Sequence, residues 1–471
     1  MNNKDFRKHA HKLVDWMADY LENKGSYPVS PDVQPGDIYQ QIPKGAPELP
    51  ESFDYIFQDF EQIIMPGMTH WQHPAFFGYF PANNSEPSIL AEMLMSTLGA
   101  QCMSWLTSPA ATELEEKVLE WLRDAKGLNS SWQGVIQDTA STATLCAILS
   151  ARERASNFSI NKDGFTGQEK YRIYSSSHVH SSVDKAMRIA GLGEANLVKV
   201  AVDKSHAMDL NSLSEAISAD LMAGFTPLCV VSALGTTSST AIDPVKEIGE
   251  ICEEYELWHH IDAAYAGTAL LLPECRWMLD NKVKADSYVF NPHKWMFTNF
   301  DCSVLYVKDA EYLVNTFSMT PEYLRTKQDE HVNNYRDWGI QLGRRFRALK
   351  LWFVLRSYGL EGIREKLRLH LSLSKKVANL VENHENLELL APIPLNTICF
   401  RFVDKSLSEE KLNSLNAQWM HSVNATGKVF FTHTKLDGKY CIRWVIGQTD
   451  VSVNEIEMAW ELLMEKLAEL S

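Results

Sequence analysis

Apolar residues between positions 86 and 310 follow two alternating patterns. Seven short runs are almost continuously apolar, which is typical of strands buried on both faces of a parallel sheet. Stretches with helical spacing, such as 143–154 and 243–255, separate several of these runs. We therefore expect the α/β class, with a mostly parallel seven-stranded sheet covered on both faces. The predicted strands are 134–137, 171–176, 197–202, 227–234, 258–262, 287–291 and 302–307.

The N-terminal part of the chain has a different pattern. An apolar stripe predicts an amphipathic helix over residues 4–24, and a second helix is expected over about 52–64. Six prolines between residues 28 and 50 favour an extended segment that is neither helix nor central strand. These pieces bury too little apolar area to fold alone, so they need another surface, and a second copy of the chain is the natural candidate. The stripe consists of Phe6, Leu13, Met17, Tyr20 and Leu21.

Helix signals further along the chain indicate where the domains divide. Ser108, Pro109 and Gly127 predict the cap, first turn and end of one helix. A long helix is expected over 344–359, leading into an α+β unit with short strands near 397–403 and 440–446. We expect three parts, which are an N-terminal arm (1–85), a large domain (86–359) and a small C-terminal domain (360–471).

Composition excludes several classes of protein. The 471 residues are 45% hydrophobic and 22% charged, which is typical of a soluble globular chain. A formal net charge of −15 argues against nucleic-acid binding. The polar N-terminus predicts no signal peptide, and no apolar run is long enough to predict a membrane span. The eight cysteines are scattered without a C-x-x-C pair, which favours a reducing cytoplasm over a disulfide framework or a zinc ribbon.

Polar residues follow several predicted strands, at the sheet edge where α/β proteins bind ligands. Residues 138–143, DTASTA, open a helix whose amides suit a phosphate dianion, although an ordinary Ser/Thr cap is the more common explanation of such a segment taken alone. This segment is not a P-loop. A second hydroxyl-rich loop covers 235–240, GTTSST. It is compatible with a ligand site or with a plain turn.

Two titratable residues also follow strands. Asp262 ends the run 258–262, and a buried carboxylate needs a cation or a strong donor, unless it caps a helix or forms an internal salt bridge. His180 follows 171–176, where a lone histidine is more often structural. His259 and His260 lack the spacing of a metal site, so we predict no metal.

Lys294 completes the set, within the sequence YVFNPHKW. A lysine amine is a nucleophile only when deprotonated, and burial among aromatic residues lowers a lysine pKa. A nucleophilic lysine, a buried carboxylate and a phosphate seat are together explained by one ligand, pyridoxal 5′-phosphate (PLP).

Four motifs identify a family. NPHKW, HIDAAYAG (260–267), LGTT (234–237) and HWQHPAFFGYFPA (70–82) resemble the aromatic-L-amino-acid decarboxylases of the group II PLP-dependent decarboxylases. The similarity covers nearly the whole chain and is strongest between 70 and 360. It implies the type I PLP fold with a small C-terminal domain. It also implies a homodimer with shared active sites, in which the N-terminal helices clasp the other subunit.

The resemblance implies roles for individual residues. Lys294 resembles the Schiff-base lysine, Asp262 the partner of the pyridinium nitrogen, and His180 the stacking histidine, with Ala264 on the opposite face. A polar stretch, 313–335, resembles a mobile lid, and its Tyr323 matches the tyrosine that protonates the substrate carbon. The remaining cofactor-binding positions are Ala140, Ser141, Thr237, Asn291 and His293.

An aromatic substrate is favoured by the aromatic residues within 71–80, some of which belong to the core. In the family, Gly343 leaves room for a bulky ring. Ala82, Gln101 and Met103 depart from the Thr, Ile and Phe common in the animal enzymes. Arg344, Arg345 and Arg347 are interpreted as a solvated or interdomain helix face in preference to a substrate clamp. The predicted substrate pocket comprises Trp71, Tyr79, Phe80, Pro81, Ala82, Gln101, Met103 and Gly343, and the aromatic run also includes Phe76 and Phe77.

These features predict PLP-dependent decarboxylation of an aromatic L-amino acid to the aryl-ethylamine and CO₂. Candidate substrates are tryptophan, 5-hydroxytryptophan, tyrosine, DOPA and phenylalanine. An aldehyde synthase of the same family, which consumes O₂ and releases ammonia and peroxide, is the alternative. An inactive dimeric scaffold is a second alternative. The presence of both Tyr323 and His180 favours the decarboxylase.

Overall fold

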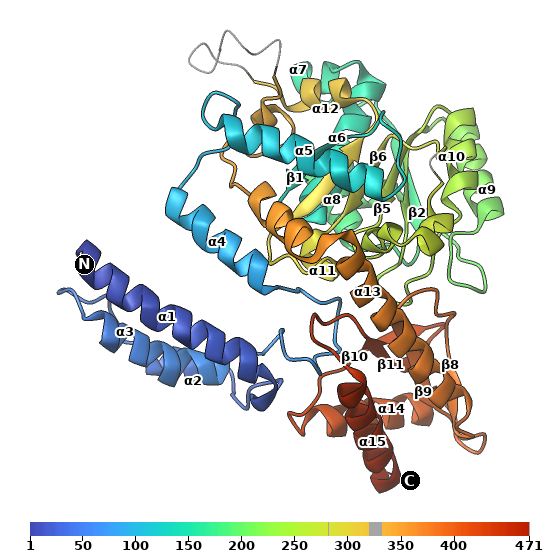
Figure 1. Ribbon diagram of the computed structural model, residues 1–471. Helices are drawn as coiled ribbons and strands as arrows, with labels where there is room; N and C mark the ends of the chain where they lie inside the picture. The colour runs from blue at the N-terminus through green and yellow to red at the C-terminus, as the bar shows by residue number, and fades with distance from the viewer. Residues whose placement is uncertain (281, 320–331, 471) are drawn as a thin grey trace. The chain divides into compact units, whose positions relative to one another are not determined.

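The chain folds into two compact units, which the computed structural model describes over residues 1–280, 282–319 and 332–470. One unit combines residues 1–81 with 401–471, and the other comprises 82–400. Figure 1 shows the elements of each. The three-part division at 85 and 359 stays a prediction.

The larger unit contains a seven-stranded sheet with the order β1-β7-β6-β5-β4-β2-β3. Four neighbouring pairs are parallel, and only β7 runs antiparallel to both of its neighbours. The mostly parallel sheet is thus confirmed, with every boundary within two residues of the expected one. The strands are β1 Gln133–Gln137, β2 Tyr171–Ser176, β3 Leu197–Val200, β4 Thr226–Ala233, β5 Trp258–Asp262, β6 Ser287–Phe290 and β7 Ser303–Val307.

Helices cover both faces of this sheet. Successive residues of β4 show it, since Val231 packs into a cluster with α6 and α8, whereas Val230 packs with α9 and α10. Strands β5, β6 and β7 are buried along their whole length, as continuous apolar runs require. The helices of this unit are α4 Glu86–Leu98, α5 Pro109–Ala125, α6 Ala140–Ser156, α7 Ser159–Asp163, α8 Ser182–Ile189, α9 Leu210–Met222, α10 Val245–Glu254, α11 Pro292–Trp295, α12 Ala310–Phe317 and α13 Ala348–Glu382, and the 3-10 turns include η5 Ala266–Leu271 and η8 Tyr335–Asp337.

The predicted boundaries of the helices and of the lid agree with the structure only in part. The helix expected over 344–359 begins four residues later, at Ala348, and its expected end coincides with a break at Gly359, whose φ of 62° and ψ of 169° are not helical; a second helical stretch follows, and α13 comprises both as far as Glu382. Ser108 stands at the N-cap of α5 as expected, but its side chain makes no capping hydrogen bond. The expected lid start at 313 lies inside α12, where Leu313 is buried.

The smaller unit contains the N-terminal helices. Helix α1, Asn3–Asn23, confirms the first prediction, and none of its residues is buried. The proline-rich segment forms one short helix that was not expected, α2 Asp37–Gln41, in the proline-free stretch between Pro35 and Pro43. The second helix remains α-helical only over α3 Phe53–Asp59 and then passes into a π-helical turn, η2 Phe60–Ile64. Helices α14 Glu409–Asn424 and α15 Val453–Leu470 complete this unit.

A second sheet has four strands in the order β10-β11-β9-β8. β10 and β11 form an antiparallel hairpin whose two-residue turn, Asp437-Gly438, has positive φ at both positions. No described helix of either unit is long and apolar enough to cross a bilayer. The strands are β8 Leu387–Leu389, β9 Thr397–Phe402, β10 Thr432–Leu436 and β11 Lys439–Val445.

Candidate active site

The titratable residues predicted from the sequence gather at the carboxyl edge of the seven-stranded sheet. Asp262 is the last residue of β5. His180, Thr237 and Lys294 each lie four residues beyond the end of β2, β4 and β6 respectively. Because these strands are parallel, their ends meet at one edge, and the fold therefore brings these side chains to the same place.

Strands β5 and β6 continue side by side past their formal ends. Ala263 donates its N–H to the Val289 carbonyl (2.9 Å), and Asn291 donates to the Ala264 carbonyl (3.0 Å). The chain then turns into α11 at Pro292, with Asn291 as N-cap. Lys294 follows in this short helix, half-buried, and its carbonyl accepts a hydrogen bond from the Asn83 side chain (2.9 Å).

Asp262 is 8% exposed, and its Oδ1 accepts the N–H of Ala264 (3.0 Å). The turn after β5 thus holds the carboxylate in place. The Asp262 carboxylate also acts on His180. Burial lowers the pKa of His180, the negative charge of Asp262 raises it, and the positive charge of Lys294 lowers it further. The imidazole, the carboxylate and the amine therefore lie within electrostatic reach of one another.

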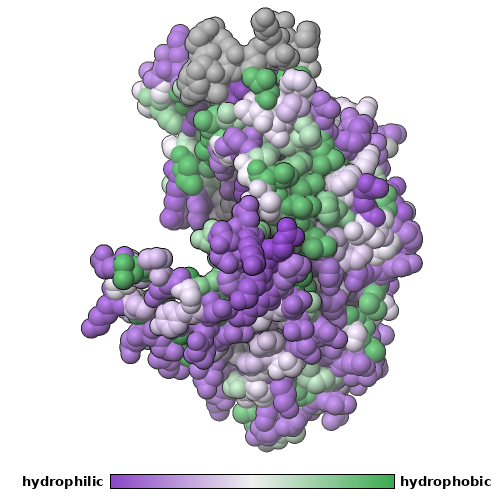
Figure 2. All heavy atoms as spheres, turned by 60° about the vertical axis from the view of Figure 1, so that its left-hand side comes forward, coloured by the Kyte–Doolittle hydropathy of each residue, from purple (hydrophilic) through white to green (hydrophobic). Residues whose placement is uncertain are grey.

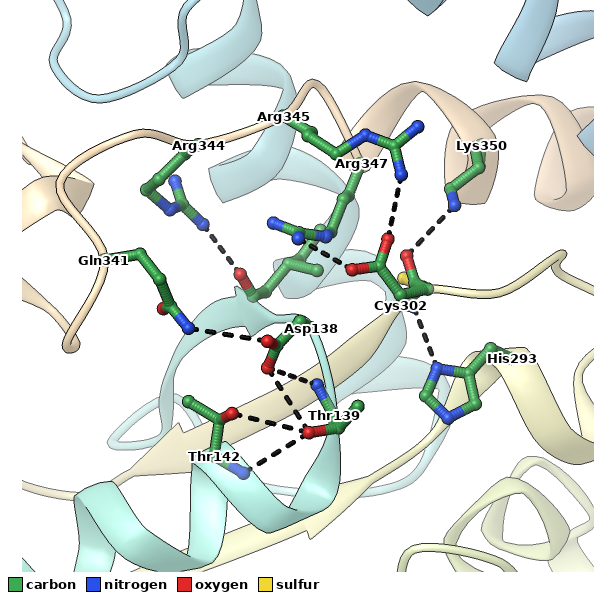
Figure 3. A network of polar contacts seen from close by, with 12 residues as sticks. Asp138, Thr139, Thr142, His293, Cys302, Gln341, Arg344, Arg345, Arg347 and Lys350 are labelled. Carbon is green, nitrogen blue, oxygen red and sulfur yellow. Dashed lines mark hydrogen bonds and ion pairs between the residues drawn. The ribbon is translucent and has the colours of Figure 1, made fainter. Parts of the chain in front are cut away.

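The imidazole of His180 is held in one tautomer. Its Nδ1 accepts the N–H of Ser182 (3.1 Å), so the neutral ring carries its proton on Nε2. His293 shows the same arrangement, because its Nδ1 accepts the N–H of Cys302 (2.9 Å; Figure 3). Burial, with a smaller contribution from Lys294, lowers the pKa of His293 to about 3. Both rings are neutral at pH 7 and present an Nε2–H donor.

The predicted phosphate seat lies at the start of α6. Ala140 and Ser141 are its first two residues, and amides at these positions lack intrahelical acceptors. Thr139 caps the helix, its Oγ1 accepting the Thr142 N–H (3.4 Å), so the capping explanation also applies. Asp138 occupies the same helix end and accepts the Thr139 N–H (2.6 Å), as Figure 3 shows. This carboxylate partly offsets the attraction of the helix end for an anion.

Beyond these positions, Asn291 is buried, and its Oδ1 accepts a hydrogen bond from Ser303 Oγ (2.7 Å). Ala264 is half-buried, and Thr237 is exposed. Sequence reasoning missed Asn83 and Ser303, because single polar residues distant in the sequence carry no pattern that would reveal these contacts.

The interpretation of the three arginines before α13 as a solvated or interdomain face is wrong for Arg344 and Arg347, whereas Arg345 is exposed to solvent as expected. Arg344 is buried, pairs with Glu115 (2.7 Å) and donates to the Ile136 carbonyl (2.8 Å). Arg347 pairs with Asp301 (2.8 Å), and the exposed Arg345 reaches the same carboxylate (3.1 Å). These partners lie within the larger unit, so the arginines form a network beside His293 and Cys302 (Figure 3) rather than an interdomain face.

Two predicted pocket residues of the larger unit lie together. Gln101 Oε1 accepts the N–H of Arg344 (2.7 Å), and a Cβ placed on Gly343 would lie 3.2 Å from Gln101 Nε2. Both residues line a cavity of about 350 Å³. The carbonyl of the half-buried Met103 accepts the Arg336 N–H (2.9 Å), and Ala82 is half-buried.

The other predicted pocket residues belong to the smaller unit. Trp71 and Tyr79 stack with ring centroids 5.5 Å apart, and Arg443 lies 4.6 Å from the Phe80 ring. Pro81 is buried. Phe76 and Phe77 are fully buried and belong to the core, as expected for part of this aromatic run. Tyr323 lies outside the described residues.

Another cavity, of about 760 Å³, lies against α5 and β1 and contains none of the predicted site residues. The described residues include no group of three or more His, Cys, Asp or Glu side chains able to hold a metal. His259 and His260 are instead bonded to Ser232 (2.8 Å) and Ser287 (2.8 Å) within the sheet. We therefore place the candidate site at the carboxyl edge.

The donors at this edge suit PLP: an amine for its aldehyde, a carboxylate for its ring nitrogen, imidazole N–H groups, and helix amides for its phosphate. Fold and site together define a PLP-dependent enzyme of fold type I. The model of the pyridoxal-dependent decarboxylase conserved domain matches residues 35–403. The chain belongs to the pyridoxal-dependent decarboxylase family, and its cofactor is PLP.

Similar proteins extend over the whole chain. Tryptophan decarboxylase 2 of Oryza sativa subsp. japonica is 41% identical, covering 99% of this chain and 95% of the relative. A phenylacetaldehyde synthase of Arabidopsis thaliana is 42% identical, covering 100% and 97%. The crystal structure of Oryza sativa TDC with PLP and tryptamine superposes with a TM-score of 0.97 at 34% identity, covering 100% of this chain and 99% of that one.

Proposed function

We propose that this protein decarboxylates an aromatic L-amino acid to the aryl-ethylamine and CO₂. One observation carries the proposal: Asp262 ends β5, and His180 and Lys294 follow the ends of the parallel strands β2 and β6, at the carboxyl edge of a type I fold. Relatives at about 40% identity that are named for tryptophan or tyrosine decarboxylation support the aromatic substrate class.

Each residue has a proposed task. When bound, PLP supplies an electron sink for the pair released as the Cα–carboxylate bond breaks. Lys294 would hold the cofactor aldehyde, and the Asp262 carboxylate would keep a proton on the ring nitrogen. His180 would present its Nε2–H toward the reacting groups, and Ala264 would pack on the opposite ring face. Tyr323, outside the described residues, would deliver the proton to Cα, on the resemblance alone.

The phosphate would be held by the first amides of α6, at Ala140 and Ser141, with Thr237 and the neutral Nε2–H of His293 as further donors. Asn291, fixed by Ser303, would orient the turn that carries Lys294. The substrate side chain would lie among the aromatic and small residues of the predicted pocket.

Aldehyde synthesis is the second candidate, since the Arabidopsis relative is named for it at a similar identity. The two activities differ in their products. Decarboxylation yields amine and CO₂ in equal amounts, whereas aldehyde synthesis consumes O₂ and also releases ammonia and peroxide. Retention of His180 and Tyr323 favours the amine.

A product assay tests the proposal. The purified holoenzyme is incubated with each of the five aromatic amino acids, and with glutamate and histidine as controls, while amine, CO₂ and peroxide are measured. We expect amine equal to CO₂ with the aromatic substrates. Stoichiometric peroxide would identify an aldehyde synthase, and equal turnover of glutamate would overturn the aromatic substrate. Absence of borohydride labelling at Lys294 would indicate an inactive scaffold.

We also propose that the protein is a homodimer. Helix α1 buries no residue, and Phe6 is 62% exposed. Helix α4 exposes a stripe of Leu90 (54%), Leu94 (47%) and Leu98 (63%) at helical spacing. Figure 2 shows hydrophobic side chains gathering on one face of the molecule. Such surfaces are typical of an interface between subunits.

Light scattering tests this assembly. The double variant Leu94→Glu and Leu98→Glu should shift the mass from dimer to monomer, because it places two charges in the proposed interface. Met222→Glu, at an 84% exposed position on α9, is the control and should remain dimeric. A monomeric wild type at micromolar concentration would contradict the proposal.

The eight cysteines are free and buried, which supports a reducing compartment such as the cytoplasm.

A further inference from the structure

Two buried aromatic side chains stack beside the candidate site. Tyr265 and Trp295 directly follow Ala264 and Lys294 in the sequence. Their ring centroids lie 5.0 Å apart with the planes 10° from parallel, and the residues are 1% and 0% exposed. The stack therefore joins the two segments that carry the predicted ring-packing alanine and the predicted Schiff-base lysine.

The polar atoms of both rings are bonded to distant parts of the same unit. Trp295 donates its Nε1–H to Nδ1 of His370 on α13 (2.8 Å). Asn396 donates its side-chain N–H to the Tyr265 hydroxyl (2.6 Å). His370 and Asn396 are both buried. Because buried polar groups are costly to leave unpaired, these bonds fix the rotation of both rings.

The backbones of the two segments are also pressed together. A Cβ placed on Gly267 would lie 2.5 Å from the Cβ of Phe290, so η5 packs against β6 without room for a methyl group. The hydrogen bond from Asn291 to Ala264 lies just ahead of the stack. A shift of Trp295 is thus transmitted to Lys294, its neighbour in the same turn of helix.

We propose that Tyr265, Trp295 and His370 form a positioning unit that sets where the Lys294 amine lies relative to Asp262 and Ala264. They act through their neighbours in the chain and are positioning residues. The inference rests on the proposed role of Lys294 as the cofactor-holding residue. The inference gives a function to Trp295, the aromatic residue that follows Lys294 in the NPHKW motif. Trp295 itself takes no part in the proposed reaction.

Trp295→Phe keeps an aromatic ring and removes the N–H donor. We expect kcat with the preferred aromatic amino acid to fall at least about tenfold, since small displacements of reacting groups are costly. KM should stay within about threefold, as no substrate contact is removed. The visible circular dichroism of the bound cofactor should change, because it reports the orientation of the ring in its site.

Trp258→Phe is the matched control. Trp258 is 1% exposed and donates its indole N–H to Ser287 Oγ (2.8 Å), but it stands at the opposite end of β5 from Asp262. This variant loses an equivalent buried hydrogen bond. Its kcat and visible dichroism should match those of the wild type.

His370 offers a second pair of variants. His370→Leu removes the acceptor, whereas His370→Asn keeps an oxygen near the position of Nδ1. Hydrogen exchange measured by mass spectrometry on the holoenzyme should accelerate over 292–296 in His370→Leu and return toward wild type in His370→Asn. This readout is independent of turnover, and kcat should follow the same order.

Wild-type kcat and dichroism in Trp295→Phe, or an equal loss in Trp258→Phe, would overturn the inference. Unchanged exchange over 292–296 in His370→Leu would do so as well. Failure of the proposed function is distinguishable, because the wild type itself would then carry no borohydride-labelled Lys294 or would form no amine.

Discussion

Two histidines near Lys294 are held by the same kind of hydrogen bond. His180 and His293 each accept a backbone N–H at Nδ1. A protonated ring has no lone pair there, so these bonds favour the neutral form, in agreement with the lowered pKa of both residues. Neither neutral imidazole adds a positive charge that would repel a proton on the ring nitrogen of the cofactor, which supports the proposed role of the Asp262 carboxylate.

Asp262→Asn should abolish most of the activity while leaving the cofactor attached to Lys294. Loss of the proton-holding carboxylate is expected to lower kcat by about 10²- to 10⁴-fold. The rate is measured with the cofactor content of each sample determined by its absorbance. Asp286→Asn is the control, since Asp286 is paired with Arg154 (2.8 Å) just before β6, at the opposite edge of the sheet. A decrease in kcat of less than tenfold in Asp262→Asn would contradict the proposed role.

Gly343→Ala tests the space available to the substrate ring. The new methyl group would lie 3.2 Å from Gln101 Nε2, so the amide must move or the cavity must shrink. We expect kcat/KM for tryptophan to fall about tenfold relative to that for tyrosine, because one methyl-sized volume is worth that much discrimination. Equal changes for both amino acids would show that Gly343 does not bound the ring pocket.

At the level of helices and strands, pattern alone located the sheet well. Strands such as β6 and β7 are buried along their whole length and consist mostly of apolar residues, so their positions are visible in the sequence. Helix ends were less predictable. The arginine-rich segment before α13 has helical periodicity but is held by Asp301 and Glu115 in a non-helical conformation, and nothing local signals those distant partners.

Alanine substitutions at two glycines of α13, one at the kink and one beyond it, should change the free energy of unfolding in opposite directions. Gly359 has φ 62° and ψ 169°, a region almost confined to glycine, so Gly359→Ala should destabilise by about 1–3 kcal/mol. Gly362 lies in the helical part, where a Cβ would meet only Tyr358 Cβ at 3.5 Å. Gly362→Ala should stabilise by about 0.5–1 kcal/mol. Urea unfolding midpoints measure both, and shifts of the same sign would contradict this account.

Across the whole molecule, the supports of the site come from sequence positions far apart. Asn83, Ser303 and His370 each bond to a residue within four positions of Lys294. Isolated polar residues of this kind have no periodic signature, and only the fold brings them together. The motif residues carry a pattern visible in the sequence because the proposed chemistry requires their type, whereas the residues that hydrogen-bond to them depend on tertiary contacts.

Burial of titratable groups in the sheet also determines how the stability of the molecule depends on pH. His259 and His260 are fully buried in β5, and burial lowers the pKa of each to about 4. In the unfolded chain they bind protons below about pH 6.5. Between these values the unfolded state binds more protons, so stability falls as the pH decreases from 6.5 toward 4. Each group contributes a loss of about 2 kcal/mol between pH 7 and pH 5.

His259→Gln removes one of these groups while keeping a polar side chain near Ser232 and the Lys284 carbonyl. Between pH 7 and pH 5, the unfolding free energy of the variant should fall by about 2 kcal/mol less than that of the wild type. Urea titrations at a fixed protein concentration give both values, because assembly makes stability concentration-dependent. The unfolding free energy of the control variant His421→Gln, at an exposed position on α14, should fall as that of the wild type does. If all three proteins lose the same free energy, proton uptake by the strand histidines does not drive the acid sensitivity of the fold.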